Sequence, residues 1–471
     1  MKESNQTEST MTFESSHAPS RSSDDIHQMT RGSLTMAWQG MSGTLFWVYT
    51  GAVLAVAYGT MDALIGLVLA AAFYSIVTAV VSRYAIANRT TVAEFSRTIL
   101  GVKGAIITSI IFGLVAIYYA LFEGQIVAYA FQATFGGETW VWNLVVVLYS
   151  TPLVLGGARR FMDKINGWLM PIYFLGLIGA VVWAGAVYGF GDAWMHHTAA
   201  KPLIFAAGGP GWLATFAGYL GAFVIVMYAM DFAALAKRKD SKFHLAVNFG
   251  PFFYFFGFGF NAIIGILLTF LIPGTQASGI GVAGGIMSLM GVLGLVVLFA
   301  TQTRPNAINY YVAAANLQAF GNRVFRANLP NTFWVVTSAV LIYLLMTLPV
   351  IQYVLLALSW QGVLCAAWVS IAVTHVLLLR GKNEEWGGIP DSRYRQINAS
   401  GLIAWSISTL IGVLALQIGV FIPELGHLSS TWSPIFTAVS AAAIYALLWN
   451  SPLKRTGLIN EDTDSLVVSV R

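Results

Sequence analysis

Residues 299–311 read FATQTRPNAINYY and lie inside a long apolar segment. The stretch combines one arginine and one proline with five Thr, Gln or Asn side chains. An arginine at the centre of a bilayer costs about 2.5–3.5 kcal/mol even on lenient insertion scales, and such residues are usually partnered or functional. The stretch therefore predicts a membrane-spanning helix that lines a polar pathway.

The composition is typical of a polytopic membrane protein. The chain has 471 residues, of which 57% are hydrophobic and 10% are charged, whereas soluble domains carry about 25% charge. The single cysteine, Cys365, lies in an apolar run and excludes disulfides and cysteine metal sites. No extramembrane segment is large enough for a nucleotide-binding domain, which argues against an ATP-driven pump.

Twelve apolar segments are each long enough for a spanning helix of about 20 residues. Residues 1–32 are polar and predict a disordered cytoplasmic tail, and residues 451–471 predict a second cytoplasmic tail. Between them, residues 33–450 form one all-α transmembrane domain, because lipid leaves no partner for an open backbone. A short interfacial helix is expected at 92–103. The predicted spans are 33–58, 61–82, 105–131, 140–156, 165–189, 211–235, 247–272, 286–315, 332–349, 351–379, 401–421 and 433–450.

The basic residues give the orientation. With the N-terminus in the cytoplasm, 23 of the 25 Lys and Arg residues fall in inner loops or tails, Lys201 falls outside, and Arg304 lies within a span. The positive-inside rule requires only a bias of this kind. The sequence therefore predicts a multi-pass protein of the cell's inner (plasma) membrane, with both termini cytoplasmic and no role in nucleic-acid binding.

Two spans share the same interruption. The first contains Gly40-Met41-Ser42-Gly43, and the sixth contains Gly218-Tyr219-Leu220-Gly221. Glycine-interrupted segments at corresponding places in two halves of a chain indicate broken helices around a transporter site. The alternative is close helix packing through small residues.

The third span carries the only deep acid, Glu123, which shares a helix face with Tyr119 four residues earlier. Because a buried ion needs a partner, we hypothesise a pair between Glu123 and Arg304. The pair is either structural or part of transport. No paired acids or His/Glu metal set accompanies it within the spans, so neither an enzyme nor an organic cofactor is expected.

Four local sequences resemble the nucleobase–cation symporters, the family of the purine and cytosine permeases. They are Leu34-Thr35 through Gly40 and on to Thr50-Gly51, Gly101-Val102-Lys103-Gly104, Asp231-Phe232, and Asn306-Ala307. Their order and spacing match the cytosine permeases along most of the spans. The resemblance implies two inverted five-helix repeats plus two extra helices, with helices 1 and 6 broken.

The resemblance also implies a function and a set of site residues. Such a protein imports a planar heterocycle of the purine, pyrimidine, hydantoin or allantoin type by cation-coupled alternating access. By position, Phe223 and Tyr119 match the aromatic residues that stack on the ring. The implied substrate-binding residues are Tyr119, Phe223, Arg304, Glu123, Gln302 and Asn306.

Three positions differ from cytosine permeases and argue against cytosine itself. Ala116, Arg304 and Ile225 stand where a glutamine, an asparagine and a small polar residue are expected. A sodium site would use Gly40, Gly43 and Thr303, whereas proton coupling through Glu123 is the competing hypothesis. An amino acid or other organic solute symporter of the same fold is the alternative function. Partners other than the substrate and the lipid bilayer are not expected.

Overall fold

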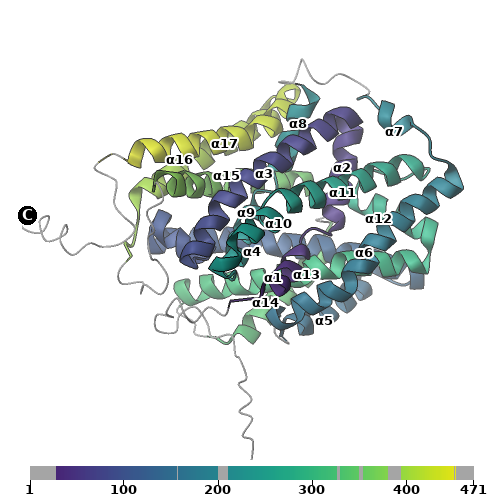
Figure 1. The fold of residues 1–471 in the computed structure, drawn as a ribbon, viewed down its shortest axis with the longest axis horizontal. Helices are drawn as coiled ribbons and strands as arrows, with labels where there is room; N and C mark the ends of the chain where they lie inside the picture. The colour runs from purple at the N-terminus through teal and green to yellow at the C-terminus, as the bar shows by residue number, and fades with distance from the viewer. Residues whose placement is uncertain are drawn as a thin grey trace, which may run out of the picture.

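The computed structural model describes residues 28–155, 158–199, 210–325, 329–349, 354–379, 394–449 and 451. Most of both predicted tails, and the loop residue Lys201, lie outside these ranges. The described residues form helices joined by short turns (Figure 1). The α-helices are α1 (Arg31–Gln39), α2 (Leu45–Tyr58), α3 (Thr60–Asn88), α4 (Val92–Phe135), α5 (Thr139–Leu155), α6 (Ala158–Tyr188), α7 (Ala193–His196), α8 (Gly211–Leu220), α9 (Val224–Ala233), α10 (Ser241–Val247), α11 (Pro251–Leu271), α12 (Gly279–Met290), α13 (Val292–Val324), α14 (Asn331–Met346), α15 (Val354–Leu378), α16 (Ala399–Phe421) and α17 (Gly426–Trp449), with short 3-10 turns at Arg238–Asp240 and Pro423–Leu425.

Within these ranges, each predicted span except the eighth coincides with one helix or with a broken pair, α1–α2 or α8–α9. By length and hydropathy alone, seven of the described helices are able to cross a membrane, or eight if the bent pair α8–α9 is one span. The chain is thus a multi-pass membrane protein. The helix α13 is not among the seven, because Arg304 and the amides around it lower its hydropathy.

Two predicted boundaries are corrected by glycine turns. Span eight begins at Val292 rather than at 286, because Gly291 adopts a φ of 55° and separates α12 from α13. The segment between predicted spans seven and eight consequently holds part of α12. Within α4, Gly101 adopts a φ of 81°, so the predicted interfacial segment turns away from the span that follows it.

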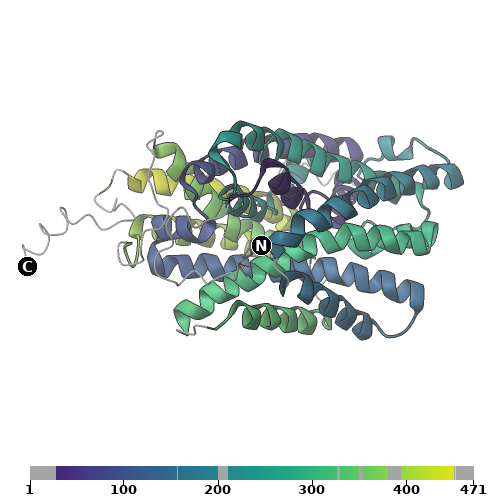
Figure 2. The ribbon, with the colours of Figure 1, turned by 60° about the horizontal axis from the view of Figure 1, so that its bottom comes forward.

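The two halves of the chain make corresponding contacts. The helix α2 of span one packs on α11 of span seven, and α8 of span six packs on α3 of span two. Exchanging the two five-span halves interchanges these contacts, as the predicted inverted repeats require. The last two helices, α16 and α17, pack on each other at one edge of the bundle (Figure 1). Turned by 60°, the helices still run side by side along the long axis (Figure 2).

Small residues set the close approach of α2 and α11. A Cβ at Gly265 would meet the carbonyl oxygen of Val48, and one at Gly51 would meet the backbone of Ala262. Membrane helices gain packing energy where small residues let their backbones approach. These glycines therefore hold the interrupted first span against the seventh.

We expect Gly265→Ala to lower the stability of the purified protein by about 1–3 kcal/mol, the usual cost of overpacking. Gly259→Ala on the same helix is the matched control, since no atom lies within 4 Å of the added Cβ. Thermal unfolding in detergent measures both. Equal unfolding temperatures for the two variants would refute this packing.

Candidate functional site

The first span is interrupted between α1 and α2. The helix α1 ends at Gln39, and α2 begins at Leu45 after the cap residue Thr44. The Thr44 hydroxyl accepts a hydrogen bond from the Phe46 amide at 2.8 Å. An interrupted helix leaves carbonyls at the end of its first half and amides at the start of its second. Inside a membrane these groups need protein partners.

Two side chains of α13 supply such partners on opposite sides of the interruption. The Leu45 amide donates to Oε1 of Gln302 at 2.8 Å. Nη2 of Arg304 donates to the Gln39 carbonyl oxygen at 2.8 Å. The end of a helix favours a cation, and the start of a helix favours a negative group. We call Gln302 and Arg304 the α13 clamp, because together they hold both ends of the break.

The guanidinium of Arg304 is fully buried and is held on three sides. Besides its bond to Gln39, Nε donates to Oδ1 of Asn166 at 3.1 Å. The guanidinium carbon lies 4.9 Å from the centre of the Tyr173 ring, a cation–π contact. Such contacts stabilise by about 2 kcal/mol when desolvated. Backbone dipole, amide and aromatic ring together offset the burial of the charge.

The two glycines of the G-x-x-G step make room for this arrangement. A Cβ at Gly43 would lie 2.5 Å from Nη1 of Arg304 and 3.0 Å from the Tyr173 ring. A Cβ at Gly40 would lie 2.6 Å from Nδ2 of Asn166. The interruption therefore needs glycine at these positions for steric reasons.

The predicted pair between Glu123 and Arg304 is not formed. Arg304 turns toward the end of α1 and toward α6, where it finds a carbonyl, an amide and a ring. Glu123 lies beside the Thr44 hydroxyl and the Gln302 side chain. Its Oε2 has no hydrogen-bond partner among the described residues. The guanidinium is thus stabilised by a helix end rather than by the acid.

The sixth span is also interrupted. The axis bends by 46° between α8 and α9, over residues 221–223. From α15, Nε2 of Gln361 donates to the Gly221 carbonyl at 2.9 Å and to the Tyr119 hydroxyl at 3.0 Å. One amide therefore links this break to the third span.

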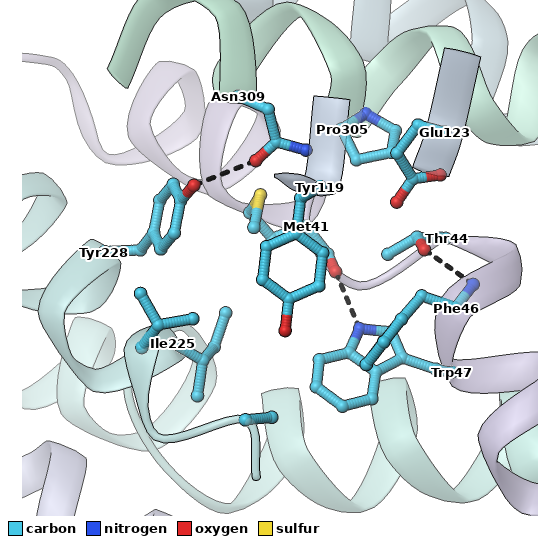
Figure 3. A pocket seen from close by; sticks show the side chains of 12 residues that line it. Met41, Thr44, Phe46, Trp47, Tyr119, Glu123, Ile225, Tyr228, Pro305 and Asn309 are labelled. Carbon is cyan, nitrogen blue, oxygen red and sulfur yellow. Dashed lines mark hydrogen bonds between the residues drawn. The ribbon is translucent and has the colours of Figure 1, made fainter. Parts of the chain in front are cut away.

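A pocket lies between the two breaks (Figure 3). Its walls come from both interruptions, from α4 and from α13. The lining residues are Met41, Thr44, Phe46, Trp47, Tyr119, Glu123, Ala222, Val224, Ile225, Tyr228, Pro305 and Asn309.

Aromatic rings dominate these walls, and their orientations are fixed. The Trp47 indole donates to the Met41 carbonyl at 3.1 Å. The rings of Phe46 and Tyr119 meet edge to face at 5.2 Å. The Tyr228 hydroxyl donates to Oδ1 of Asn309 at 2.9 Å, so the Asn309 amide presents its NH₂ group as a donor (Figure 3).

The structure distributes the predicted substrate-binding residues over different surroundings. Tyr119 and Glu123 line the pocket. Phe223 is buried against Phe73 and Tyr74 of α3, with ring centres 6.0 and 5.8 Å away. Asn306 donates to the Ser150 hydroxyl of α5 at 3.3 Å.

The predicted cation ligands Thr303 and Gly43 contact different residues. Thr303 faces α5, where its hydroxyl lies 3.1 Å from that of Tyr149. At Gly43 the neighbouring α13 side chain is the Arg304 guanidinium.

Of the lining residues, only Tyr119 and Glu123 were predicted as ligands from the sequence. Four of the others carry an aromatic ring or an amide, namely Phe46, Trp47, Tyr228 and Asn309. Phe46 and Trp47 directly follow the G-x-x-G step, and Asn309 follows Pro305 by one helical turn. These spacings place them beside the first break and on the pocket side of α13. Tyr228 carries no sequence signal that separates it from the other buried aromatics.

No protein-family model matches the sequence, and no curated protein matches it. Solved structures share its fold along almost the whole chain. One of them is Mhp1, a nucleobase-cation-symport-1 family transporter, in a closed conformation with bromovinylhydantoin bound. Its TM-score is 0.67 at 15% sequence identity, and the match covers 94% of this chain and 96% of the Mhp1 chain. Its inward-facing conformation has a TM-score of 0.69 at 14% identity, covering 98% and 99%. A Na⁺-coupled sialic acid symporter in its substrate-bound outward-open state has a TM-score of 0.59 at 12% identity, covering 91% and 92%.

These similarities establish the fold. The chain has the all-α architecture of these transporters, and the predicted fold class is confirmed. In this chain, the broken first and sixth spans lie beside the pocket.

We expect Gly43→Ala to destabilise the protein by about 1–3 kcal/mol, because the new methyl group displaces the guanidinium from its bonds. Gly167→Ala is the control, since an added Cβ there has no neighbour within 4 Å. Thermal unfolding measures both variants. Shortening Arg304 to alanine in the Gly43→Ala background should reduce the penalty of the methyl group; an unchanged penalty would contradict the assigned contact.

Proposed function

We propose that this chain is a secondary active transporter that imports a small planar heterocycle by cation-coupled alternating access. The observation that carries the proposal is the aromatic pocket between two helix breaks, with Glu123 and Asn309 on one side of it (Figure 3). Aromatic walls suit flat rings of many kinds, and a few fixed polar groups then select among them.

The fold supports this assignment. The similar proteins include a transporter with a bound hydantoin and a sodium-coupled sialic acid symporter. Broken helices at the middle of the membrane are where transporters of this architecture bind substrates. The pocket of this chain lies between its two helix breaks.

The polar groups favour a neutral ring that carries both N–H and C=O groups. The Asn309 amide offers a donor, since its oxygen is occupied by Tyr228. The Glu123 carboxyl offers an acceptor with a free oxygen. A cyclic amide, imide or ureide has one matching edge of this kind, as nucleobases, hydantoins and allantoin do.

The amino acid alternative fits this pocket less well. A carboxylate would need free amides at the start of α2. The Leu45 amide is bound to Gln302, and the Phe46 amide is bound to the Thr44 hydroxyl.

The charge pattern supports a plasma-membrane location with both termini in the cytoplasm. Residues 33–450 then form the transporter domain between two cytoplasmic tails. We propose that the transporter works as a single chain, since both halves of the pocket come from one polypeptide.

Thermal shift of the purified chain with uracil, cytosine, hypoxanthine, hydantoin, allantoin and L-phenylalanine tests the substrate class. We expect at least one planar heterocycle to raise the unfolding temperature and L-phenylalanine to have no effect. Asn309→Ala should weaken the binding of that heterocycle about 2- to 10-fold, as expected for the loss of one hydrogen bond of about 0.5–1.5 kcal/mol.

Asn316→Ala is the matched control, about two turns later on the same helix, where the amide donates to the Val312 carbonyl and does not line the pocket. Its affinity should equal that of the unmodified chain. Equal losses in both asparagine variants would exclude Asn309 as a ligand, and a shift only with L-phenylalanine would favour the amino acid alternative.

Glu123→Gln tests proton coupling in reconstituted vesicles. The amide keeps the size of the side chain but carries no transferable proton, so we expect the heterocycle still to bind and to exchange across the membrane. Accumulation driven by an imposed pH gradient should be lost. Accumulation at the unmodified level would show that Glu123 does not carry the coupling proton.

A further inference from the structure

The end of α1 is where a free cation would be expected in this architecture. Carbonyls at the end of a half-helix coordinate the ion in transporters with broken helices. One structurally similar protein is coupled to Na⁺. The contacts at the end of α1 in this chain therefore decide whether a sodium ion fits there.

The Gln39 carbonyl is already occupied by a cation of the protein. Nη2 of Arg304 donates to it at 2.8 Å, and the Ser42 hydroxyl donates to it at 2.8 Å as well. A sodium ion needs several hard oxygens directed at one point. With the Ser42 backbone amide at 3.2 Å, this oxygen already accepts three hydrogen bonds, and the guanidinium would repel a second cation at this distance.

Three neighbouring carbonyls are occupied too. The Ala37 oxygen accepts from Asn166 at 3.3 Å, and the Met41 oxygen accepts from the Trp47 indole at 3.1 Å. The Ser42 oxygen accepts from Nδ2 of Asn261 at 2.7 Å. Each bond comes from a buried side chain, so these three carbonyls are satisfied by the protein itself.

The guanidinium also takes up the space at the break. Its Nη1 lies 2.5 Å from the position a Cβ would have at Gly43, and it has no hydrogen-bond partner among the described residues. Thr303, the hydroxyl predicted as a sodium ligand, is directed to Tyr149 instead. The donor set therefore does not fit sodium.

We propose that the Arg304 guanidinium is the resident cation of the first helix break, and that this site neither binds nor requires sodium. The consequence for ion coupling rests on the proposed transport function, whereas the absence of sodium at this site does not. An arginine side chain stays charged and remains attached to the protein. This site consequently cannot couple transport to sodium by taking up an ion on one side and releasing it on the other.

Sodium binding to the purified full-length chain tests the proposal without any organic substrate. We expect radioactive sodium to show no saturable binding. We also expect the unfolding temperature to be the same in sodium chloride and in choline chloride of equal ionic strength. Saturable sodium binding, or stabilisation by sodium, would overturn the proposal whether or not the chain carries heterocycles.

Arg304→Ala tests the role of the charge. Removing the guanidinium leaves the Gln39 carbonyl without its cation, so the variant should be less stable and should regain stability with low concentrations of guanidinium chloride. Arg83→Ala, which removes an exposed arginine from α3, is the control and should gain no stability from guanidinium chloride. A folded Arg304→Ala protein that guanidinium chloride does not stabilise would overturn the assignment.

Arg304→Lys keeps a positive charge at the site and provides the second variant. It should fold and remain insensitive to sodium, although it loses the multiple hydrogen bonds of the planar guanidinium. If Arg304→Ala does not fold, this variant and the unmodified chain decide the question. Sodium-dependent stabilisation of the lysine variant would contradict a resident-cation role.

Discussion

The bond from Arg304 to the Gln39 carbonyl is the interaction on which the site depends. A helix interrupted within a membrane exposes backbone groups that lipid cannot satisfy. In this chain α13 provides a partner on each side of the break: the Arg304 guanidinium binds the end of α1, and the Gln302 amide oxygen binds the start of α2. The polarity of each side chain matches the partial charge of the helix end that it meets. The break is thereby a fixed feature rather than a weak point.

The α13 clamp also explains where the pocket lies. Gln302 and Arg304 hold the break from one part of α13, while Pro305 and Asn309, further along the same helix, line the cavity. The interruption of span six supplies the opposite wall. A movement of α13 relative to α1 would therefore change the break and the pocket together, which is the coupling that alternating access needs.

The sequence predicted the broken spans because glycine steps at corresponding positions carry that signal directly. It predicted Tyr119 and Glu123 on one face because helical spacing is regular. It did not predict the partner of Arg304, because matching of opposite charges selects Glu123 and does not consider the carbonyl at the end of α1. The direction of Phe223 depends on how the backbone turns at residues 221–223, which periodicity does not describe. Asn309 was not predicted as a ligand, because Arg304 and Asn306 of the same stretch were assigned as the substrate-binding residues instead.

Electron cryo-microscopy of the protein in a sodium-containing buffer would show whether Arg304 or a sodium ion occupies the first helix break. We expect density for the Arg304 guanidinium next to the Gln39 carbonyl and over the Tyr173 ring. An ion-sized peak bound to the Gln39 carbonyl, with Arg304 turned away from the break, would contradict it.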